Sequence, residues 1–134
     1  MKGIADTGFL VAVVRERDMH HAWAAEIAAQ VTEPLLTCEA VLAETAFHLG
    51  SVELVLGMIE TGLIALAFDC SEHLPQLAAL AKRYTDRQPD LADLCLIRMS
   101  ELFPRHSVVT VDRGDFAVYR RNKREAIPLV CPPK

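Results

Sequence analysis

Four acidic residues in separate parts of the sequence are the best candidates for chemistry. Asp6 and Asp112 each follow a short apolar segment, whereas Glu44 and Asp93 interrupt helical patterns whose neighbouring positions are apolar. A lone carboxylate in apolar surroundings is costly unless it is paired or coordinated. These four acids therefore indicate a site in which each carboxylate has a partner.

A hard divalent cation is the partner that this set of acids indicates. Two carboxylates ~6 Å apart repel by about 3 kcal/mol at an effective dielectric of about 20, so four that converge must either take up protons or bind a cation. Ligands that are all oxygen favour Mg²⁺ or Mn²⁺ over Zn²⁺. A water on Mg²⁺ can attack a phosphodiester while the ion stabilises the developing charge, so such a site is able to hydrolyse a phosphodiester without a nucleophilic side chain.

Two further acids and two threonines adjoin these four, and the sequence allows two interpretations of each. Asp90 lies three residues before Asp93 on one helix face, where it either caps the helix or adds to the acid cluster. Asp115 either caps a helix or helps to bind the metal. Thr7 and Thr110 either hydrogen-bond a carboxylate or a metal-bound water, or have ordinary cap and strand roles.

The elements that must position these acids alternate between strands and helices. This alternation predicts an α/β fold, a three-layer α/β/α sandwich with a mostly parallel central sheet of four to five strands. Ligands of such sheets bind beyond the carboxyl ends of the strands, where Asp6 and Asp112 lie. The expected strands are 3–5, 35–36, 63–68, 107–111 and 127–130.

Two of these strands carry a further expectation. The continuous apolar run 63–68 is typical of a strand covered on both faces, and the proline in 127–130 indicates an edge strand. Asp18 is expected to cap the second helix. The expected helices are 9–14, 18–31, 37–49, 52–60, 71–84, 90–102 and 116–121.

Length and composition favour a single domain over residues 1–134. Hydrophobic residues make up 51% of the chain and charged residues 24%, which excludes a disordered chain. The net charge of −4 excludes a globally basic nucleic-acid binder but allows a local basic patch. We expect no signal peptide and no membrane span, and the four cysteines lack a C-x-x-C pair, as in free thiols of a cytoplasmic protein.

Basic residues gather in the segment 113–124, where Asp115 is the one acid. Either this segment is the solvated surface of the last helix, or it contacts the phosphates of an RNA backbone. The basic residues are Arg113, Arg120, Arg121, Lys123 and Arg124.

The segments that carry the acids resemble those of the PIN-domain ribonucleases, and among these the VapC-like toxins of type II toxin–antitoxin systems. DTGFL at 6–10 resembles the family's opening segment, and AE at 43–44 resembles its helical glutamate. PDLAD at 89–93 is similar to its D-x-x-D-A segment, and VTVDRGDF at 109–116 to its T-x-D-x-x-D-F segment. Leu94 departs from the family, which usually has alanine there.

The resemblance implies a PIN-like fold and a metal-dependent endoribonuclease that cleaves single-stranded RNA. The metal-binding acids are then Asp6, Glu44, Asp93 and Asp112, with Asp115 as an accessory ligand. Asp90 is then a further acid that supports these ligands without binding the metal itself. Magnesium is the expected ion, and we expect Mn²⁺ to substitute for it. The resemblance also implies a homodimer and a small antitoxin protein that lies over the acidic groove.

Two other functions fit the sequence less well. In a metal-independent binding or regulatory module the acids would be structural, and Mg²⁺ or Mn²⁺ would leave the melting temperature unchanged. A phospho-accepting receiver domain would need an adjacent pair of acids after the first strand, whereas Thr7 and Gly8 follow Asp6.

Overall fold

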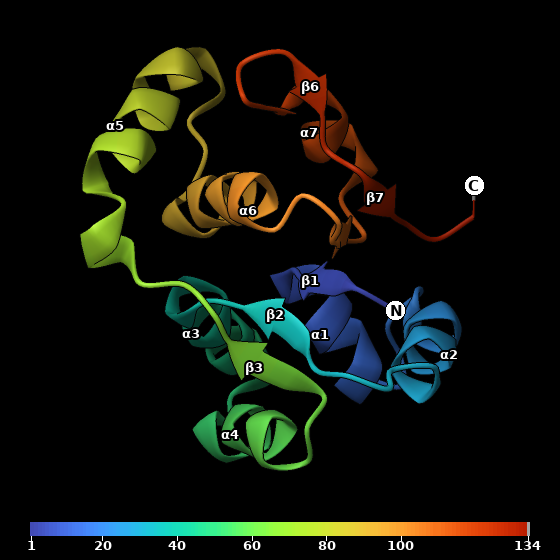
Figure 1. Ribbon diagram of the computed structural model, residues 1–134. Coiled ribbons are helices and arrows are strands. Elements are labelled where there is room, and N and C mark those ends of the chain that lie inside the picture. The colour runs from blue at the N-terminus through green and yellow to red at the C-terminus, as the bar shows by residue number, and fades with distance from the viewer. Residues whose placement is uncertain (134) are drawn as a thin grey trace.

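A five-stranded parallel sheet lies at the centre of the computed structural model, which describes residues 1–133. The spatial order of the strands is β3-β2-β1-β4-β7, so the first strand is central (Figure 1). This architecture confirms the predicted α/β class and its parallel sheet. The strands are β1 (Gly3–Ala5), β2 (Leu35–Thr37), β3 (Ile64–Leu66), β4 (Ser107–Val109) and β7 (Leu129–Val130).

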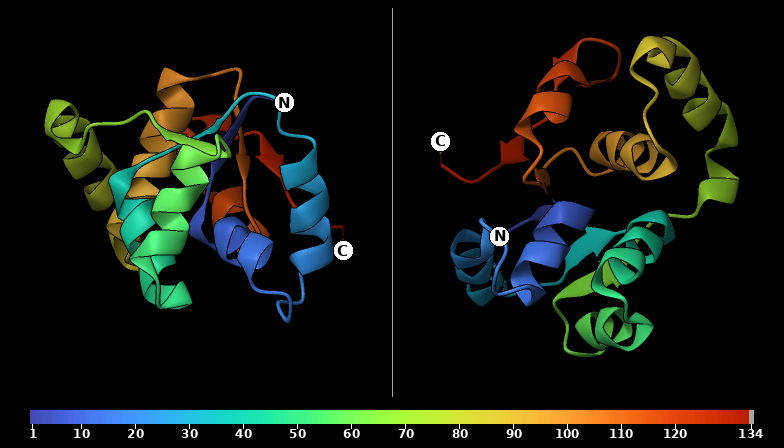
Figure 2. Two further views of the ribbon diagram at one scale, coloured as in Figure 1. Left: turned by 90° about the horizontal axis from the view of Figure 1, so that it is seen from below. Right: turned by 180° about the vertical axis from the view of Figure 1, so that it is seen from behind.

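Helices cover both faces of this sheet (Figures 1 and 2). The chain steps from β1 to β2 to β3 towards one edge, and then returns past β1 to β4 and β7. Because parallel crossovers are right-handed, the reversal places the later helices on the opposite face from the earlier ones. One face carries α1 (Thr7–Val14), α2 (His21–Ala29), α3 (Glu39–Leu49) and α4 (Val52–Glu60); the other carries α5 (Leu74–Arg83), α6 (Leu91–Leu102) and α7 (Arg113–Val118).

The core lies where β1 and α6 meet. All three residues of β1 are buried, as a central strand between two helical layers requires. Seven of the residues of α6 are buried, among them Leu94, the position at which this chain departs from the family pattern. Asp93 therefore belongs to a helix with mostly buried residues, as its apolar sequence surroundings predicted.

Two strand predictions have different outcomes. The segment 127–130 does contribute an edge strand, β7, as its proline indicated. The run 63–68 contributes only β3, which lies at the other edge, and Leu66 is 47% exposed there. The prediction that this run is covered on both faces is therefore wrong at Leu66, which lies on an edge strand of the sheet, although Phe68 at the end of the run is buried.

Two helix predictions also need correction. Asp18 does not cap the second helix; its carboxylate accepts a hydrogen bond from the backbone N–H of His20, which occupies the cap position itself. The expected helix 116–121 begins earlier and ends at Val118, and the chain then forms an antiparallel hairpin. Asn122 and Lys123 turn this hairpin with positive φ angles of 48° and 70°. Its strands are β5 (Arg120–Arg121) and β6 (Glu125–Ala126).

Between residues 1 and 133, no helix has the length and apolar character needed to cross a membrane. Two short 3-10 segments, Cys70–Glu72 and Thr85–Arg87, precede α5 and α6.

Candidate active site

A cavity of about 380 Å³ opens beyond the carboxyl ends of β1 and β4, where the topology predicts a ligand site. Carboxylates from five elements or loops line it, and none of its described lining residues is lysine or arginine. The structure thus brings together all six acids singled out in the sequence, together with Asp18. The acids are Asp6, Asp18, Glu44, Asp90, Asp93, Asp112 and Asp115.

Asp6 forms the buried floor of this acidic cavity. It ends β1 and caps α1, with one carboxylate oxygen accepting from the Thr7 N–H at 2.7 Å. The Thr110 hydroxyl donates to the other oxygen at 2.6 Å. Burial raises the pKa of Asp6 to about 6, although these two hydrogen bonds oppose the shift. The carboxylate is therefore held in one orientation, and no lysine or arginine among the described residues that line the cavity balances its negative charge.

Asp93 faces the same cavity from the first turn of α6. Burial raises its pKa to about 7, and repulsion from Asp90 and Asp6 adds to the shift. Asp90 caps the helix by accepting from the Asp93 N–H at 2.8 Å, and it also lines the cavity, so both interpretations of Asp90 hold. The hydroxyl of Tyr119 donates to Asp93 Oδ2 at 3.1 Å.

Glu44 reaches the cavity from α3, beside the first turn of α1. The Thr7 hydroxyl donates to Glu44 Oε2 at 3.1 Å, so this threonine orients a carboxylate in addition to its helical role. Burial raises the pKa of Glu44, and repulsion from Asp90 raises it further. The tertiary contact between α1 and α3 thus brings two acids 38 residues apart in the sequence to one pocket.

Asp112 and Asp115 form the side of the cavity that follows β4. Asp112 caps α7 by accepting from the Asp115 N–H at 3.0 Å, and burial raises its pKa. The Thr110 hydroxyl that donates to Asp6 also accepts from the Asp112 N–H at 2.9 Å. Thr110 therefore links the ends of β1 and β4. Asp115 forms an ion pair with Arg87 at 3.0 Å.

The donor set fits a hard divalent cation. Four acids have raised pKa values because each is partly or fully buried near other acids, and a cation in the cavity would relieve that repulsion. Within residues 1–133, no three acidic, histidine or cysteine side chains are already grouped as a formed metal site. Magnesium does not require one, because it keeps several waters and binds through one or two carboxylates.

The basic residues of the segment 113–124 lie outside the acidic cavity. Arg113 donates to the Pro132 carbonyl, and Arg120 donates to carbonyls at the end of α7. Lys123 and Arg124 are exposed in the turn of the hairpin. These positions are compatible with contacts to a long RNA, but not with contacts to a phosphate inside the cavity.

Arg121 departs from the expectation that it contacts RNA. Its side chain is only 7% exposed, and its guanidinium donates to the carbonyls of Ser100 and Pro104 at 3.0 and 3.1 Å. It also donates to Glu125 at 2.6 Å. Arg121 therefore holds the hairpin against α6, and a phosphate cannot reach it.

Two functional candidates were missed in the sequence. Tyr119 contacts Asp93 across 26 residues, and Arg87 contacts Asp115 across 28. Arg87 stands next to the PDLAD segment, which is a weak local signal. Tyr119 has no such signal, because only the tertiary structure brings this phenol, at the end of α7, to the acid in the first turn of α6.

Comparison with known protein families identifies the family to which the chain belongs. The model of the PIN domain family matches residues 4–125, which is most of the chain and includes every acid of the cavity. No curated protein matches the sequence. The chain therefore belongs to the PIN domain family, whose members are generally nucleases.

Proposed function

We propose that this protein is a Mg²⁺-dependent endoribonuclease that cleaves single-stranded RNA, and that it is the toxin of a type II toxin–antitoxin pair. The observation that carries the proposal is the acidic cavity, in which Asp6, Glu44, Asp93 and Asp112 converge with raised pKa values. The raised values indicate that the cavity lacks positive charge, which is what a cation site requires.

The four acids would hold the ion, with Asp115 as an accessory. A bound Mg²⁺ supplies an activated water and stabilises the charge that develops on the phosphate. Mn²⁺ would substitute for it because the donors are all oxygen. Ion binding competes with protonation of the acids, so affinity should increase as the pH rises past the pKa values of Asp6 and Asp93.

The residues around the acids orient them. Thr110 and the Thr7 N–H hold both oxygens of Asp6, while the Thr7 hydroxyl holds Glu44. The hydroxyl of Tyr119 donates to Oδ2 of Asp93. Such supporting hydrogen bonds fix the direction of each ligand before an ion or substrate arrives.

Exposed apolar residues support the proposal of protein partners, both a small antitoxin and a second copy in a homodimer. On α3, Phe47 is 82% exposed and stands between positions 44 and 48, whose side chains line the cavity. A partner seated on Phe47 would cover the cavity mouth. The neighbouring α4 exposes Val52, Leu54 and Leu56. Large exposed apolar side chains gathered on two neighbouring helices are typical of a surface that meets a protein partner.

A cytoplasmic location is part of the same proposal. Cys38, Cys70, Cys95 and Cys131 are free thiols. Free thiols persist in a reducing compartment, which is also where messenger and transfer RNA are found.

The deciding experiment is RNA cleavage by the Asp93→Asn variant in Mg²⁺. The substitution keeps the shape of the side chain but removes its charge, so we expect the rate to fall by at least about 100-fold. Asp86→Asn is the matched control, because Asp86 is exposed and does not line the cavity. Undiminished cleavage by Asp93→Asn would overturn the proposal.

Thermal unfolding separates this proposal from a metal-independent binding or regulatory module. An ion that binds only the folded state stabilises it by about 2.7 kcal/mol at a hundredfold excess over Kd. We expect Mg²⁺ and Mn²⁺ to raise the melting temperature of the wild type but not of Asp93→Asn. An unchanged melting temperature of the wild type at saturating Mg²⁺ and Mn²⁺ would favour the module.

A further inference from the structure

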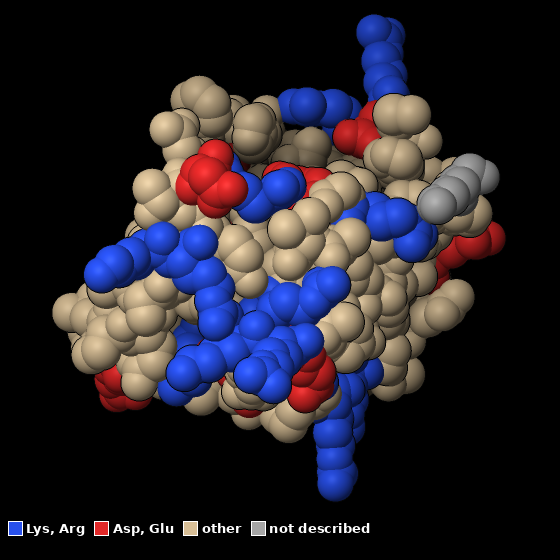
Figure 3. Space-filling view, turned by 90° about the horizontal axis from the view of Figure 1, so that it is seen from above, with Lys and Arg blue, Asp and Glu red and all other residues tan. Residues whose placement is uncertain are grey.

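A second cavity, of about 400 Å³, lies between α5, α6 and the β5–β6 hairpin. One basic side chain from each of these elements lines it: Arg83, Arg98 and Lys123. Figure 3 shows that Lys and Arg gather on this side of the molecule. We call this cavity the cationic groove, and it shares no lining residue with the acidic cavity.

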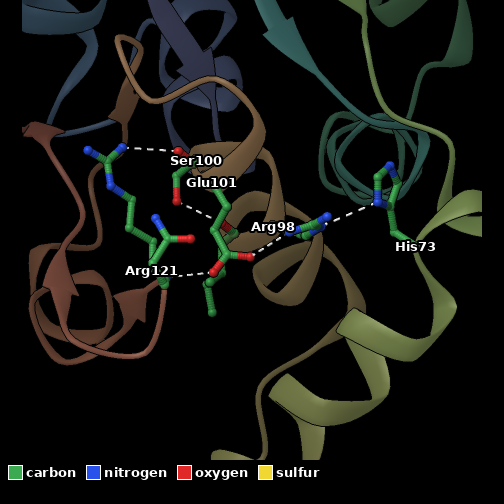
Figure 4. Close-up of polar contacts among 7 residues, drawn as sticks. His73, Arg98, Ser100, Glu101 and Arg121 are labelled. Atoms are coloured by element: carbon green, nitrogen blue, oxygen red, sulfur yellow. Dashed lines mark hydrogen bonds and ion pairs between the residues drawn. The ribbon is translucent and has the colours of Figure 1, made fainter.

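The floor of the cationic groove is a connected set of polar contacts (Figure 4). Arg98 donates to His73 at 3.3 Å and pairs with Glu101 at 3.0 Å. The other oxygen of Glu101 accepts from the Asn122 N–H at 2.6 Å, which fastens the hairpin turn to α6. Glu101 is the only acid among the described lining residues, and Arg98 already balances its charge.

The remaining basic side chains of the groove carry uncompensated charge. Arg83 and Lys123 are exposed, and neither takes part in an ion pair among residues 1–133. Lys82 and Arg124 adjoin them in the sequence and are also exposed and without an ion pair in the described chain. The groove is therefore positive, although the whole chain has a net charge of −4.

The cationic groove lies along α6, and the acidic cavity lies at the first turn of the same helix. Asp93 and Glu101 are eight residues apart, which is about 12 Å along the helix axis at 1.5 Å per residue. Arg87 follows Arg83 by four residues in the sequence, in the 3-10 segment after α5, and pairs with Asp115 at the acidic cavity, so this segment connects the two cavities. Positive side chains thus lead from the mouth of the cavity to the groove.

We propose that the cationic groove binds the phosphate backbone of the RNA strand beside the cleavage point. This inference rests on the proposed function. The acidic cavity repels a polyanion, so the substrate needs positive charge nearby to remain bound. Arg83 and Lys123 supply it in a groove lined by arginine, lysine and amide groups, which bind phosphates without reading the base sequence.

The test is a fluorescence-anisotropy titration of labelled single-stranded RNA in EDTA, in which cleavage cannot interfere. The variant is Arg83→Gln with Lys123→Gln, since neither side chain forms an ion pair with another of residues 1–133 whose loss would destabilise the fold. The matched control is Lys2→Gln with Arg105→Gln, two exposed basic residues that line a separate hollow at the amino ends of the strands. Lys2 pairs with Glu33 at the exposed surface, where an ion pair contributes little to stability. Equal melting temperatures would verify that all three proteins are folded.

The expected result is a change in the salt dependence of binding. Each lost phosphate contact lowers the slope of log K against log salt by ~0.7 for single strands, so the Arg83/Lys123 variant should lose about 1.4. When salt rises from about 50 mM to about 200 mM, the wild-type affinity should accordingly fall about sevenfold more than that of the variant. The control should keep the wild-type slope.

Two results would overturn the groove proposal. One is a wild-type slope and affinity in the Arg83/Lys123 variant. The other is loss of binding to a polyglutamate peptide in that variant while RNA binding is unchanged, which would identify a docking site for an acidic protein segment.

The proposal for the groove and the proposal of nuclease activity can be rejected independently. If the wild type cleaves RNA in Mg²⁺ but the variant binds RNA normally, only the groove is rejected. If the groove variant loses RNA binding but the wild type shows no cleavage, the proposed nuclease activity is rejected and the groove stands. With cleavage present, the variant should show a raised KM and an unchanged kcat.

Discussion

The two ends of α6 carry opposite charge, although one short helix connects them. At its first turn, Asp90 and Asp93 face other acids, and the pKa of Asp93 is raised to about 7. At its last turn, Glu101 is paired with Arg98 and the surroundings are basic. The difference shows that the environment of a carboxylate, and not its presence on the helix, decides whether it is suited to bind a cation or to brace the fold.

The same contrast separates the basic residues. Arg121 and Arg98 are enclosed by carbonyls and acids, whereas Arg83 and Lys123 are exposed without an ion pair in the described chain. The first pair holds the groove together, and the second is free to meet a ligand. Variants of each class should therefore have different effects, on stability in one case and on binding in the other.

The largest expected effect is the loss of stability in Arg121→Met. The substitution leaves the carbonyls of Ser100 and Pro104 without their donor and removes the ion pair with Glu125. Leaving a buried acceptor without its donor costs about 1–3 kcal/mol, so for the two carbonyls together we expect a loss of about 3 kcal/mol, which urea denaturation would measure. Arg124→Met is the control and should change the free energy of unfolding by less than about 0.5 kcal/mol, because Arg124 is exposed. Equal losses in the two variants would contradict the structural role of Arg121.

A smaller effect is expected from pH in the absence of metal. Asp6 has a raised pKa of about 6 in the folded protein and an ordinary value when unfolded, so the folded state holds more protons between these values. The stabilisation is complete below about pH 4 and is lost as the pH rises through about 6; Asp93 extends the decline to about 7. Between about pH 4.5 and about pH 7.5, Asp6 alone should account for about 2 kcal/mol of this decline.

Urea denaturation in EDTA at about pH 4.5 and about pH 7.5 would measure this decline. Asp6→Asn removes the titrating group, so its free energy of unfolding should depend less on pH than that of the wild type. Saturating Mg²⁺ should restore stability at the higher pH in the wild type. A wild-type stability that increases over this interval would show that the acidic cavity is not electrostatically strained.

The smallest expected effect concerns Tyr119→Phe. Tyr119 is a positioning residue, because its hydroxyl donates to Asp93 but its side chain is not among the described residues that line the acidic cavity. Loss of a supporting hydrogen bond to a metal ligand should lower cleavage about tenfold and shift the Mg²⁺ concentration needed for half-maximal rate upward. Tyr84→Phe removes a buried tyrosine hydroxyl that contacts a backbone N–H instead of an acid, so its Mg²⁺ dependence should stay that of the wild type. Identical Mg²⁺ dependence in both variants would reject the role of Tyr119.

Much of the fold was predictable because its signals are local. Asp90 caps α6 by accepting a hydrogen bond from the N–H three positions later, a relation that the spacing of the sequence indicates directly. The cap of α7 is Asp112, whereas Asp115, which the sequence offered as a cap, lies in the first turn of that helix. The β5–β6 hairpin was not predictable in the same way. Its turn is formed by Asn122 and Lys123, which adopt positive φ angles without the glycine that usually signals such a turn.

The sequence by itself determined the acids, the apolar helical faces around Glu44 and Asp93, and the alternation of strands and helices that makes a parallel sheet. Only the tertiary structure decided which charges compensate one another. It brought Tyr119 to Asp93 and Arg87 to Asp115, and it buried Arg121 while leaving Arg83 and Lys123 exposed. The physical reason is that a charge interacts with whatever lies within several ångströms of it, and those neighbours come from segments that are distant in the chain.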